Sequence, residues 1–410
     1  MTGPDGYLPR HVEARLDSAL GSAPVVLLDG PRGVGKTTTA ARRAASSVLL
    51  PRDLDLLRAD PEGYLRALRP PVLLDEWQLA GTDLLWTVKR LVDENPEPGQ
   101  FLLTGSVEPA TYGPTYPLTG RAAHLLLRPM TRAELAGTAS EQTFLAGLVS
   151  EGPPATGQDR APAFDLAALG VPGFPAMRAS PEPRLVLDAY AHLVAQRAGE
   201  EGRDATRLLR TMRVLATLSG QAAPDQRVWD AADINKATWR HYDDLLVRTH
   251  VAAPVAAFES NRLARLTSYP KRFLADTALA LALADLGVDQ LRQDPTSAGR
   301  LLESYVAQQL RPQVDALRGN LFHVRTGAGE REVDLAVEVG GTVVGIEVKL
   351  ARRPGPADAG SLAWLRDRLG ERFAHGLVVH TGRDCYALGD RLVAVPLGLV
   401  EGRALRSGAG

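Results

Sequence analysis

The sequence predicts an α/β fold built on a parallel sheet. The apolar residues 25–28 are followed by a glycine-rich turn and then by the helix-prone residues 38–45. Two more short apolar runs, residues 71–74 and 100–103, each end in polar side chains. Apolar strands that alternate with helices are typical of a parallel sheet, and ligands bind beside the carboxyl ends of such strands.

The turn after the first run is a complete phosphate-binding loop, Gly-Pro-Arg-Gly-Val-Gly-Lys-Thr. Its glycines let backbone N–H groups surround a β-phosphate, and the Lys36 ammonium can reach the β- and γ-phosphates. The Thr37 hydroxyl can bind Mg²⁺. We therefore expect ATP to contact Gly30, Pro31, Arg32, Gly33, Val34, Gly35, Lys36, Thr37 and Thr38.

The next two runs predict the hydrolytic part of this site. We expect Asp75 to hold Mg²⁺ through water and Glu76 to orient or deprotonate the attacking water. Thr104 and Ser106 follow the third run, where small hydroxyls can sense the γ-phosphate or the water. The alternatives are a strand end capped by exposed acids and an ordinary Thr-Gly-Ser turn.

These motifs, together with Leu-Thr-Gly-Arg at residues 118–121, resemble a large group of prokaryotic AAA-type ATPases with an uncharacterised C-terminal region. The resemblance covers nearly the whole chain. It implies an α/β ATPase core, a helical lid and a C-terminal part related to PD-(D/E)xK nucleases. It also implies that Arg121 could be an arginine finger or sensor, acting in cis or, in a homo-oligomer, in trans. A surface arginine in a loop is the alternative.

Four regions are expected: an ATPase core (1–150), a linker and helical lid (151–204), a winged-helix region (205–295) and a nuclease-like α/β domain (296–410). Residues 155–183 are rich in Pro, Gly and Ala, as linkers are. Residues 185–198 have helical spacing and are expected to pack on the ATPase core. Within 206–275, three amphipathic helices precede two extended runs, 251–258 and 263–266. Acidic residues dilute the charge of the third helix, so DNA binding and an architectural role both remain open.

A β-hairpin carries the prediction for the last region. Residues 333–339 and 342–350 are β-rich and flank Gly340-Gly341, a two-residue turn. Pairing of Val339 with Thr342 places Asp334 opposite Glu347, and Lys349 on the same face. The other face is a continuous apolar layer.

The opposed carboxylates predict a divalent cation, because like charges repel and a cation removes the repulsion. We expect Mg²⁺ or Mn²⁺ at Asp334 and Glu347, with Lys349 near the water or the scissile phosphate. These residues resemble the D-x(12)-E-x-K arrangement of PD-(D/E)xK nucleases, and Glu303, in the helical run 301–309, matches the helix acid that often completes their site. The alternative is a solvated polar face in which Lys349 pairs with a carboxylate and Glu303 is ordinary helix surface.

Composition limits the remaining possibilities. The 47 basic and 48 acidic residues nearly cancel, so any contact with nucleic acid needs a local patch. The sequence shows no signal peptide or membrane span, and the single Cys385 is expected to be a buried or idle thiol, so a cytoplasmic protein is expected. The combined hypothesis is an ATPase that positions a nuclease-like domain on nucleic acid, with DNA preferred. The alternative is a regulatory or scaffold ATPase, for example of a toxin–antitoxin or defence module, whose C-terminal domain binds DNA or protein without cleaving.

Overall fold

The computed structural model describes residues 6–106, 116–139, 142–154, 161–258, 269–326 and 331–402. The chain forms two compact units. The first comprises residues 12–129 and 248–250, and the second comprises residues 1–11, 130–247 and 251–410. No helix in the described ranges is long and apolar enough to cross a membrane.

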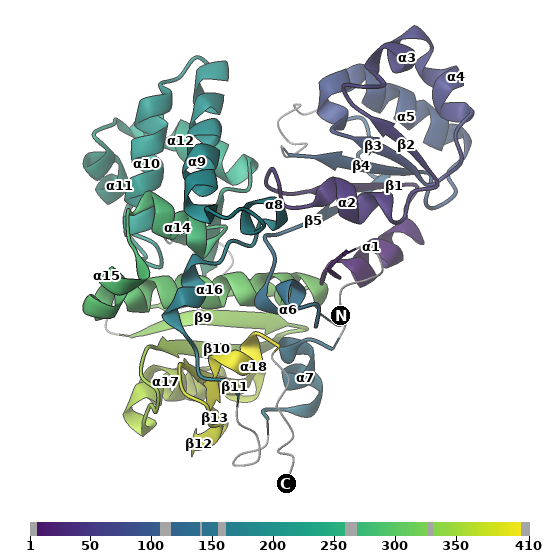
Figure 1. Ribbon diagram of the computed structural model, residues 1–410. Coiled ribbons are helices and arrows are strands. Elements are labelled where there is room, and N and C mark those ends of the chain that lie inside the picture. Colours follow the sequence, from purple (N-terminus) through teal and green to yellow (C-terminus); the bar gives the residue numbers. More distant parts are fainter. Residues whose placement is uncertain are drawn as a thin grey trace. The chain divides into compact units, whose positions relative to one another are not determined.

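The first unit contains a five-stranded sheet whose neighbouring strands are all parallel, as predicted (Figure 1). In spatial order the strands are β2 (Ser46–Leu49), β3 (Val72–Asp75), β4 (Phe101–Gly105), β1 (Val25–Asp29) and β5 (Ala122–Leu126). Every residue of β1, β3 and β4 is buried, so both faces of these central strands are covered. This burial explains why their sequences are continuous apolar runs.

Short helices surround this sheet. They are α1 (Glu13–Leu20), α2 (Lys36–Ala41), α3 (Leu54–Ala59), α4 (Pro61–Arg66), the 3₁₀ turn η1 (Trp77–Ala80) and α5 (Thr82–Glu94). The apolar side of α5, from Leu84 to Val92, shares a core with Val25 and Leu27 of β1. The phosphate-binding loop is therefore anchored at both ends, by buried β1 and by α2.

The second unit contains an eight-stranded mixed sheet. In spatial order its strands are β12 (Tyr386–Gly389), β13 (Leu392–Pro396), β11 (Phe373–His380), β10 (Thr342–Lys349), β9 (Glu332–Val339), β8 (Asn320–Arg325), β6 (Ala252–Ala257) and β7 (Lys271–Leu274). The predicted hairpin is confirmed: β9 and β10 are antiparallel, and Thr342 pairs with Val339. Gly340 and Gly341 have φ values of 58° and 86°, the left-handed backbone that this turn requires.

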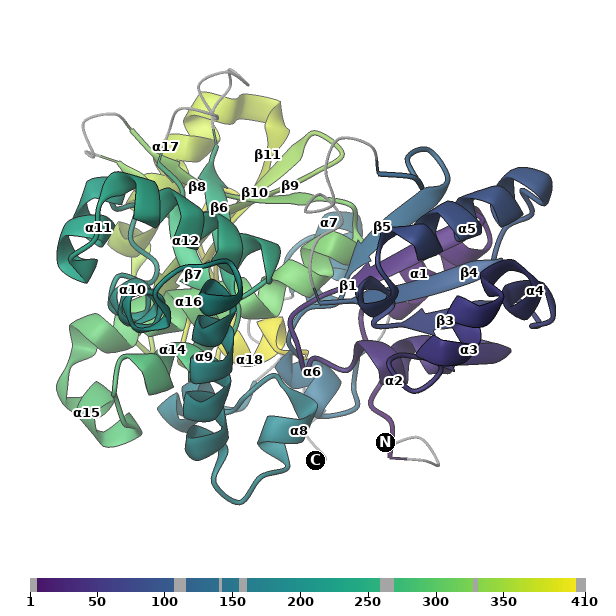
Figure 2. The ribbon, with the colours of Figure 1, turned by 90° about the horizontal axis from the view of Figure 1, so that it is seen from above.

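Helices cover both faces of this sheet. The longest, α16 (Pro295–Ala316), packs on β8, β9 and β10, while α17 (Gly360–Leu369) packs on β9, β10 and β11 from the other side (Figures 1 and 2). The other helices are α6 (Arg132–Leu135), α7 (Phe144–Glu151), η3 (Leu166–Gly170), α8 (Pro175–Arg178), α9 (Pro183–Glu200), α10 (Ala205–Thr217), α11 (Asp225–Ala232), α12 (Lys236–Arg248), α14 (Thr277–Leu283), α15 (Val288–Gln293), η4 (Pro356–Ala359), η5 (Gly370–Arg372) and α18 (Leu397–Val400).

The hairpin face that was expected to be polar carries polar side chains only near the end of the strand pair, where Asp334 and Glu347 lie. At mid-strand, Ala336 and Gly345 lie under α17, and a Cβ at Gly345 would come within 2.8 Å of Leu362 Cδ2. The α17 side is therefore as dry as the side of Val344 and Ile346. A residue pattern alone shows which side chains share a face, but it does not show which helix covers that face.

Two other expectations change. The winged-helix helices exist as α10, α11 and α12, but β6 pairs with β7 and β8 and so belongs to the eight-stranded sheet. The expected run 263–266 lies outside the described residues. The predicted lid helix, α9, packs on α10 and α14 of its own unit, and its Leu185 and Leu193 are exposed. Cys385 is buried, as expected.

Candidate functional site

The phosphate-binding loop has the backbone that its glycines predict. Gly35 has a φ of 101°, and a Cβ at Gly30 would lie 2.3 Å from the Leu127 carbonyl oxygen, so a larger residue would displace the loop. Lys36 is buried, and its ammonium donates to the carbonyls of Gly30 (2.9 Å) and Pro31 (3.1 Å). The Lys36 ammonium is thus held by two backbone carbonyls of the loop itself.

Burial lowers the pKa of Lys36, while the carboxylates of Glu76, Asp29 and Asp75 oppose that shift. The ammonium therefore lies among acidic groups at the carboxyl edge of the sheet. A bound polyphosphate would place negative charge beside this desolvated ammonium and so stabilise the charged form of Lys36.

Hydroxyl and carboxylate oxygens converge beside the loop. Thr37 Oγ1 donates to Asp75 Oδ1 at 2.8 Å, and Thr104 Oγ1 donates to the same oxygen at 2.5 Å. Thr37 is exposed, whereas Asp75 and Thr104 are buried. Oxygen donors of this kind suit Mg²⁺, so Thr37 and Asp75 fit the metal predicted for them.

Glu76 follows β3 and has a φ of 53°, the left-handed conformation, which is uncommon for a glutamate. Its N–H points to Thr104 Oγ1 at 3.4 Å, and its carboxylate accepts a hydrogen bond from the Gln78 amide. Strained backbone at the end of a strand is often found at functional sites. Glu76 and Thr104 thus lie close together, and Ser106 is buried just beyond β4.

The second unit also gathers the residues predicted for it, but around a lysine. Lys271, which is fully buried in β7, lies 2.9 Å from Glu303 Oε1, 2.8 Å from Glu332 Oε1 and 3.7 Å from Asp334 Oδ1. Asp334 Oδ2 accepts a hydrogen bond from Val348 N at 2.8 Å. The Lys271 ammonium therefore supplies a positive charge beside Asp334.

Two predicted metal ligands of this unit, Glu303 and Glu347, favour the neutral form. Burial and the charge of Asp334 raise the pKa of Glu303 to about 8. The same causes raise the pKa of Glu347 to about 8, and Lys349, 3.1 Å from Glu347 Oε2, opposes that shift. The alternative predicted for Lys349, a salt bridge to a carboxylate, is thus the arrangement in the structure.

The predicted metal at Glu303, Asp334 and Glu347 does not fit this arrangement. Within the described residues, no three His, Cys, Asp or Glu side chains lie close enough together to hold a metal ion. Lys271 and Lys349 already neutralise the carboxylates that Mg²⁺ or Mn²⁺ would have to bind. The Lys271 ammonium, 3.7 Å from Asp334 Oδ1, would repel a divalent ion bound to that carboxylate.

Comparison with known proteins supports the first site. Residues 22–136 match the family model described as an AAA domain. Residues 183–291 and 298–400 match two models described as domains of unknown function (DUF8612 and DUF4143). The AAA match, together with the loop geometry, supports a P-loop ATPase domain.

Two mycobacterial proteins and two solved structures are among the proteins similar to this chain. The uncharacterized proteins Rv2008c of Mycobacterium tuberculosis and Mb2031c of Mycobacterium bovis are each 29% identical to this chain over 402 residues, covering 94% of the chain and 83% of each relative. Among solved structures, the Walker-type ATPase PABY2304 of Pyrococcus abyssi is 16% identical, with a TM-score of 0.43 over 69% of this chain and 97% of that one. Protein VC1899 from Vibrio cholerae is 14% identical, with a TM-score of 0.19 over 93% and 96%.

Within the region that matches the AAA model, Arg121 lies away from the phosphate-binding loop. It immediately precedes β5, level with Val25 at the amino end of β1, while the loop follows the carboxyl end of β1. A five-residue strand separates these ends by about 13 Å. Arg121 forms an ion pair with Asp93 of α5 and donates to the Thr119 carbonyl at 3.2 Å. These contacts match the alternative of a surface arginine.

The predicted site residues did not include Asp29, Gln78 or Lys271, and a structural role was expected for the stretch 269–271. Asp29, fully buried at the end of β1, contacts His124 on β5, and burial raises the pKa of Asp29. Its position directly before the loop was the available sequence signal. The partners of Lys271 are at least 32 residues away in sequence, so no local pattern could reveal its contacts.

Proposed function

We propose that the AAA domain binds ATP with Mg²⁺ and hydrolyses it. The observation that carries this proposal is the convergence of Thr37 Oγ1 and Asp75 Oδ1, 2.8 Å apart, beside the loop that holds Lys36. Thr37 and Asp75 would hold Mg²⁺, which neutralises charge on the β- and γ-phosphates when bound. Lys36 would bind those phosphates, and Glu76 would orient or deprotonate the attacking water.

The test is ATP turnover by the full chain. Lys36→Ala should abolish nucleotide binding and turnover, whereas Glu76→Gln should keep binding and lower the turnover rate by at least about a hundredfold. Arg90→Ala is the matched control, because Arg90 is an exposed cation on α5 of the same unit. Unchanged turnover in Lys36→Ala would overturn the proposal.

For the second unit, we propose that it binds nucleic acid and does not cleave it with a metal ion. DNA is the first partner to test. This choice rests on Lys271, whose ammonium pairs with the acids that a nuclease would need for its metal. ATP turnover would then control binding, as in the regulatory or scaffold alternative.

A cleavage panel separates binding from a nuclease. Single-stranded DNA, duplex DNA and RNA are incubated with the full chain and Mg²⁺ or Mn²⁺, with and without ATP. We expect no cleavage under any of these conditions. Cleavage by the wild type that is lost in Asp334→Ala and Lys349→Ala would instead establish the nuclease.

Arg121 could act as a finger only on a second copy, because within one chain it lies at the other end of β1. Mixing Arg121→Ala with Glu76→Gln tests this homo-oligomer hypothesis. Recovery of turnover in the mixture would support a shared site. The ion pair with Asp93 leads us to expect no recovery, and near-normal turnover by Arg121→Ala alone.

A further inference from the structure

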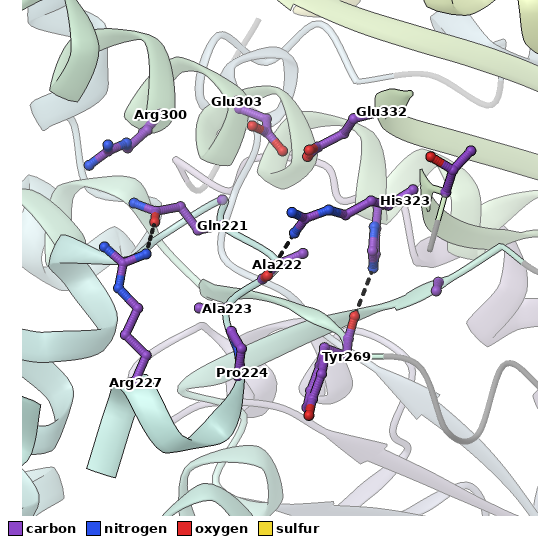
Figure 3. Close-up of a pocket in the computed structure, with 14 residues that line it drawn as sticks. Gln221, Ala222, Ala223, Pro224, Arg227, Tyr269, Arg300, Glu303, His323 and Glu332 are labelled. Atoms are coloured by element: carbon purple, nitrogen blue, oxygen red, sulfur yellow. Dashed lines mark hydrogen bonds between the residues drawn. The ribbon is translucent and has the colours of Figure 1, made fainter. Parts of the chain in front are cut away.

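The second unit contains a pocket of about 740 Å³ whose lining includes only one of the predicted site residues, Glu303. It lies where the loop before α11 meets α16 and the end of β8 (Figure 3). Its volume is within the range of small-molecule sites, roughly 300–1,000 Å³. The lining residues used below are Gln221, Arg227, Arg300, Glu303, His323, Arg325 and Glu332.

Three guanidinium groups from three elements line this pocket: Arg227 of α11, Arg300 of α16 and Arg325 of β8. Arg325 uses one N–H on the Ala222 carbonyl and Arg227 uses one on Gln221, so within the described part of the chain each guanidinium keeps further N–H donors without a hydrogen-bond partner. Arg300 makes no side-chain hydrogen bond or ion pair to any described residue. Planar guanidinium forks match the oxygens of a phosphate.

The acidic wall of the pocket does not cancel these charges. Glu303 and Glu332 both pair with the Lys271 ammonium behind them, at 2.9 and 2.8 Å. Burial also raises the pKa of Glu303 to about 8, so this acid is largely neutral near pH 7. The charge that remains on the pocket wall is positive.

Two buried polar atoms in the lining lack a hydrogen-bond partner among the described residues: Gln221 Nε2 and His323 Nδ1. Gln221 Nε2 is a donor. His323 is only 1% exposed, and its Nε2 lies 3.1 Å from the Tyr269 carbonyl, which can only accept. Its Nδ1 must then carry a lone pair, which burial preserves by lowering the pKa of His323 to about 4. An unpaired donor and an unpaired acceptor are costly to bury, which indicates a polar ligand.

We propose that this pocket binds a phosphate ester of nucleotide size, with the phosphate on Arg227, Arg300 and Arg325 and the polar body on Gln221 and His323. The phosphate ester could be a free nucleotide or the end of a nucleic-acid strand. The site goes beyond ATP hydrolysis and requires neither turnover in the AAA domain nor a metal ion.

Equilibrium binding tests this site in full-length Lys36→Ala, which silences the phosphate-binding loop, and in EDTA, which removes any metal-dependent step. The probes are a fluorescent nucleoside monophosphate and a short 5′-phosphorylated oligonucleotide. We expect saturable binding of at least one probe, weakened about tenfold to a hundredfold by Arg300→Ala and less by Arg300→Lys. Arg227→Ala should give a similar loss, and Arg292→Ala, an exposed arginine of α15, should change nothing.

The two probes distinguish the sources. Binding of the monophosphate indicates a free nucleotide, and Arg300-dependent binding of the oligonucleotide alone indicates a strand end. Absence of binding, binding that Arg300→Ala and Arg227→Ala leave unchanged, or equal competition by a dicarboxylic acid would overturn the proposal. Because the loop is already silenced, each result is independent of whether the AAA domain hydrolyses ATP.

Discussion

At the residue scale, Lys271 is the side chain on which the second unit most depends. Its buried ammonium faces the acidic side chains of Glu303, Glu332 and Asp334, so its removal leaves the charges of Glu332 and Asp334 without their partner. We predict that Lys271→Met lowers the free energy of unfolding by about 3 kcal/mol at pH 7.5. Chemical denaturation measures this loss. Lys236→Met, which alters an exposed lysine of the same unit, should change the stability by less than about 0.5 kcal/mol.

The raised pKa of Glu347 predicts a pH dependence. Between the ordinary pKa of a glutamate and about 8, the folded protein holds a proton that the unfolded chain has lost. Stability should therefore fall as the pH rises through this window. We predict that Glu347→Gln, which resembles the neutral acid, gains stability relative to the wild type between pH 5 and pH 9. Parallel stability curves for the two proteins would contradict the raised pKa.

At the element scale, short sequence patterns predicted the features that depend on residues close together in the chain. The phosphate-binding loop, its flanking strand and the β9–β10 register follow from short patterns, and the structure confirms them. The winged-helix expectation changed because β6 pairs with β8, more than 60 residues away, and no local pattern encodes such a partner. The metal expectation changed for a similar reason, because the charge opposite Asp334 comes from distant Lys271.

Helix α16 holds the second unit together through buried glutamines. Gln313, which is 3% exposed, accepts from Leu145 N at 3.1 Å and donates to the Val400 carbonyl at 3.1 Å. We predict that Gln313→Leu destabilises the second unit by about 2 kcal/mol, because both backbone groups lose their buried partner. Urea denaturation tests this. Gln293→Leu, at an exposed position of α15, is the control and should have little effect.

At the scale of the whole molecule, the chain has two compact units, each with its own sheet and core. Units with separate cores can unfold in separate transitions, and a ligand stabilises the unit that binds it. This division gives a way to assign each site to its unit.

We predict two transitions in calorimetry of the full chain. MgATP at a hundredfold excess over its Kd should stabilise one of them by about 2.7 kcal/mol, and Lys36→Ala should abolish that shift. Lys271→Met should lower the other transition and leave the response to MgATP intact, because Lys271 lies in the second unit. Equal shifts of both transitions with MgATP would show that the units unfold together, and a MgATP shift that survives Lys36→Ala would place the nucleotide elsewhere.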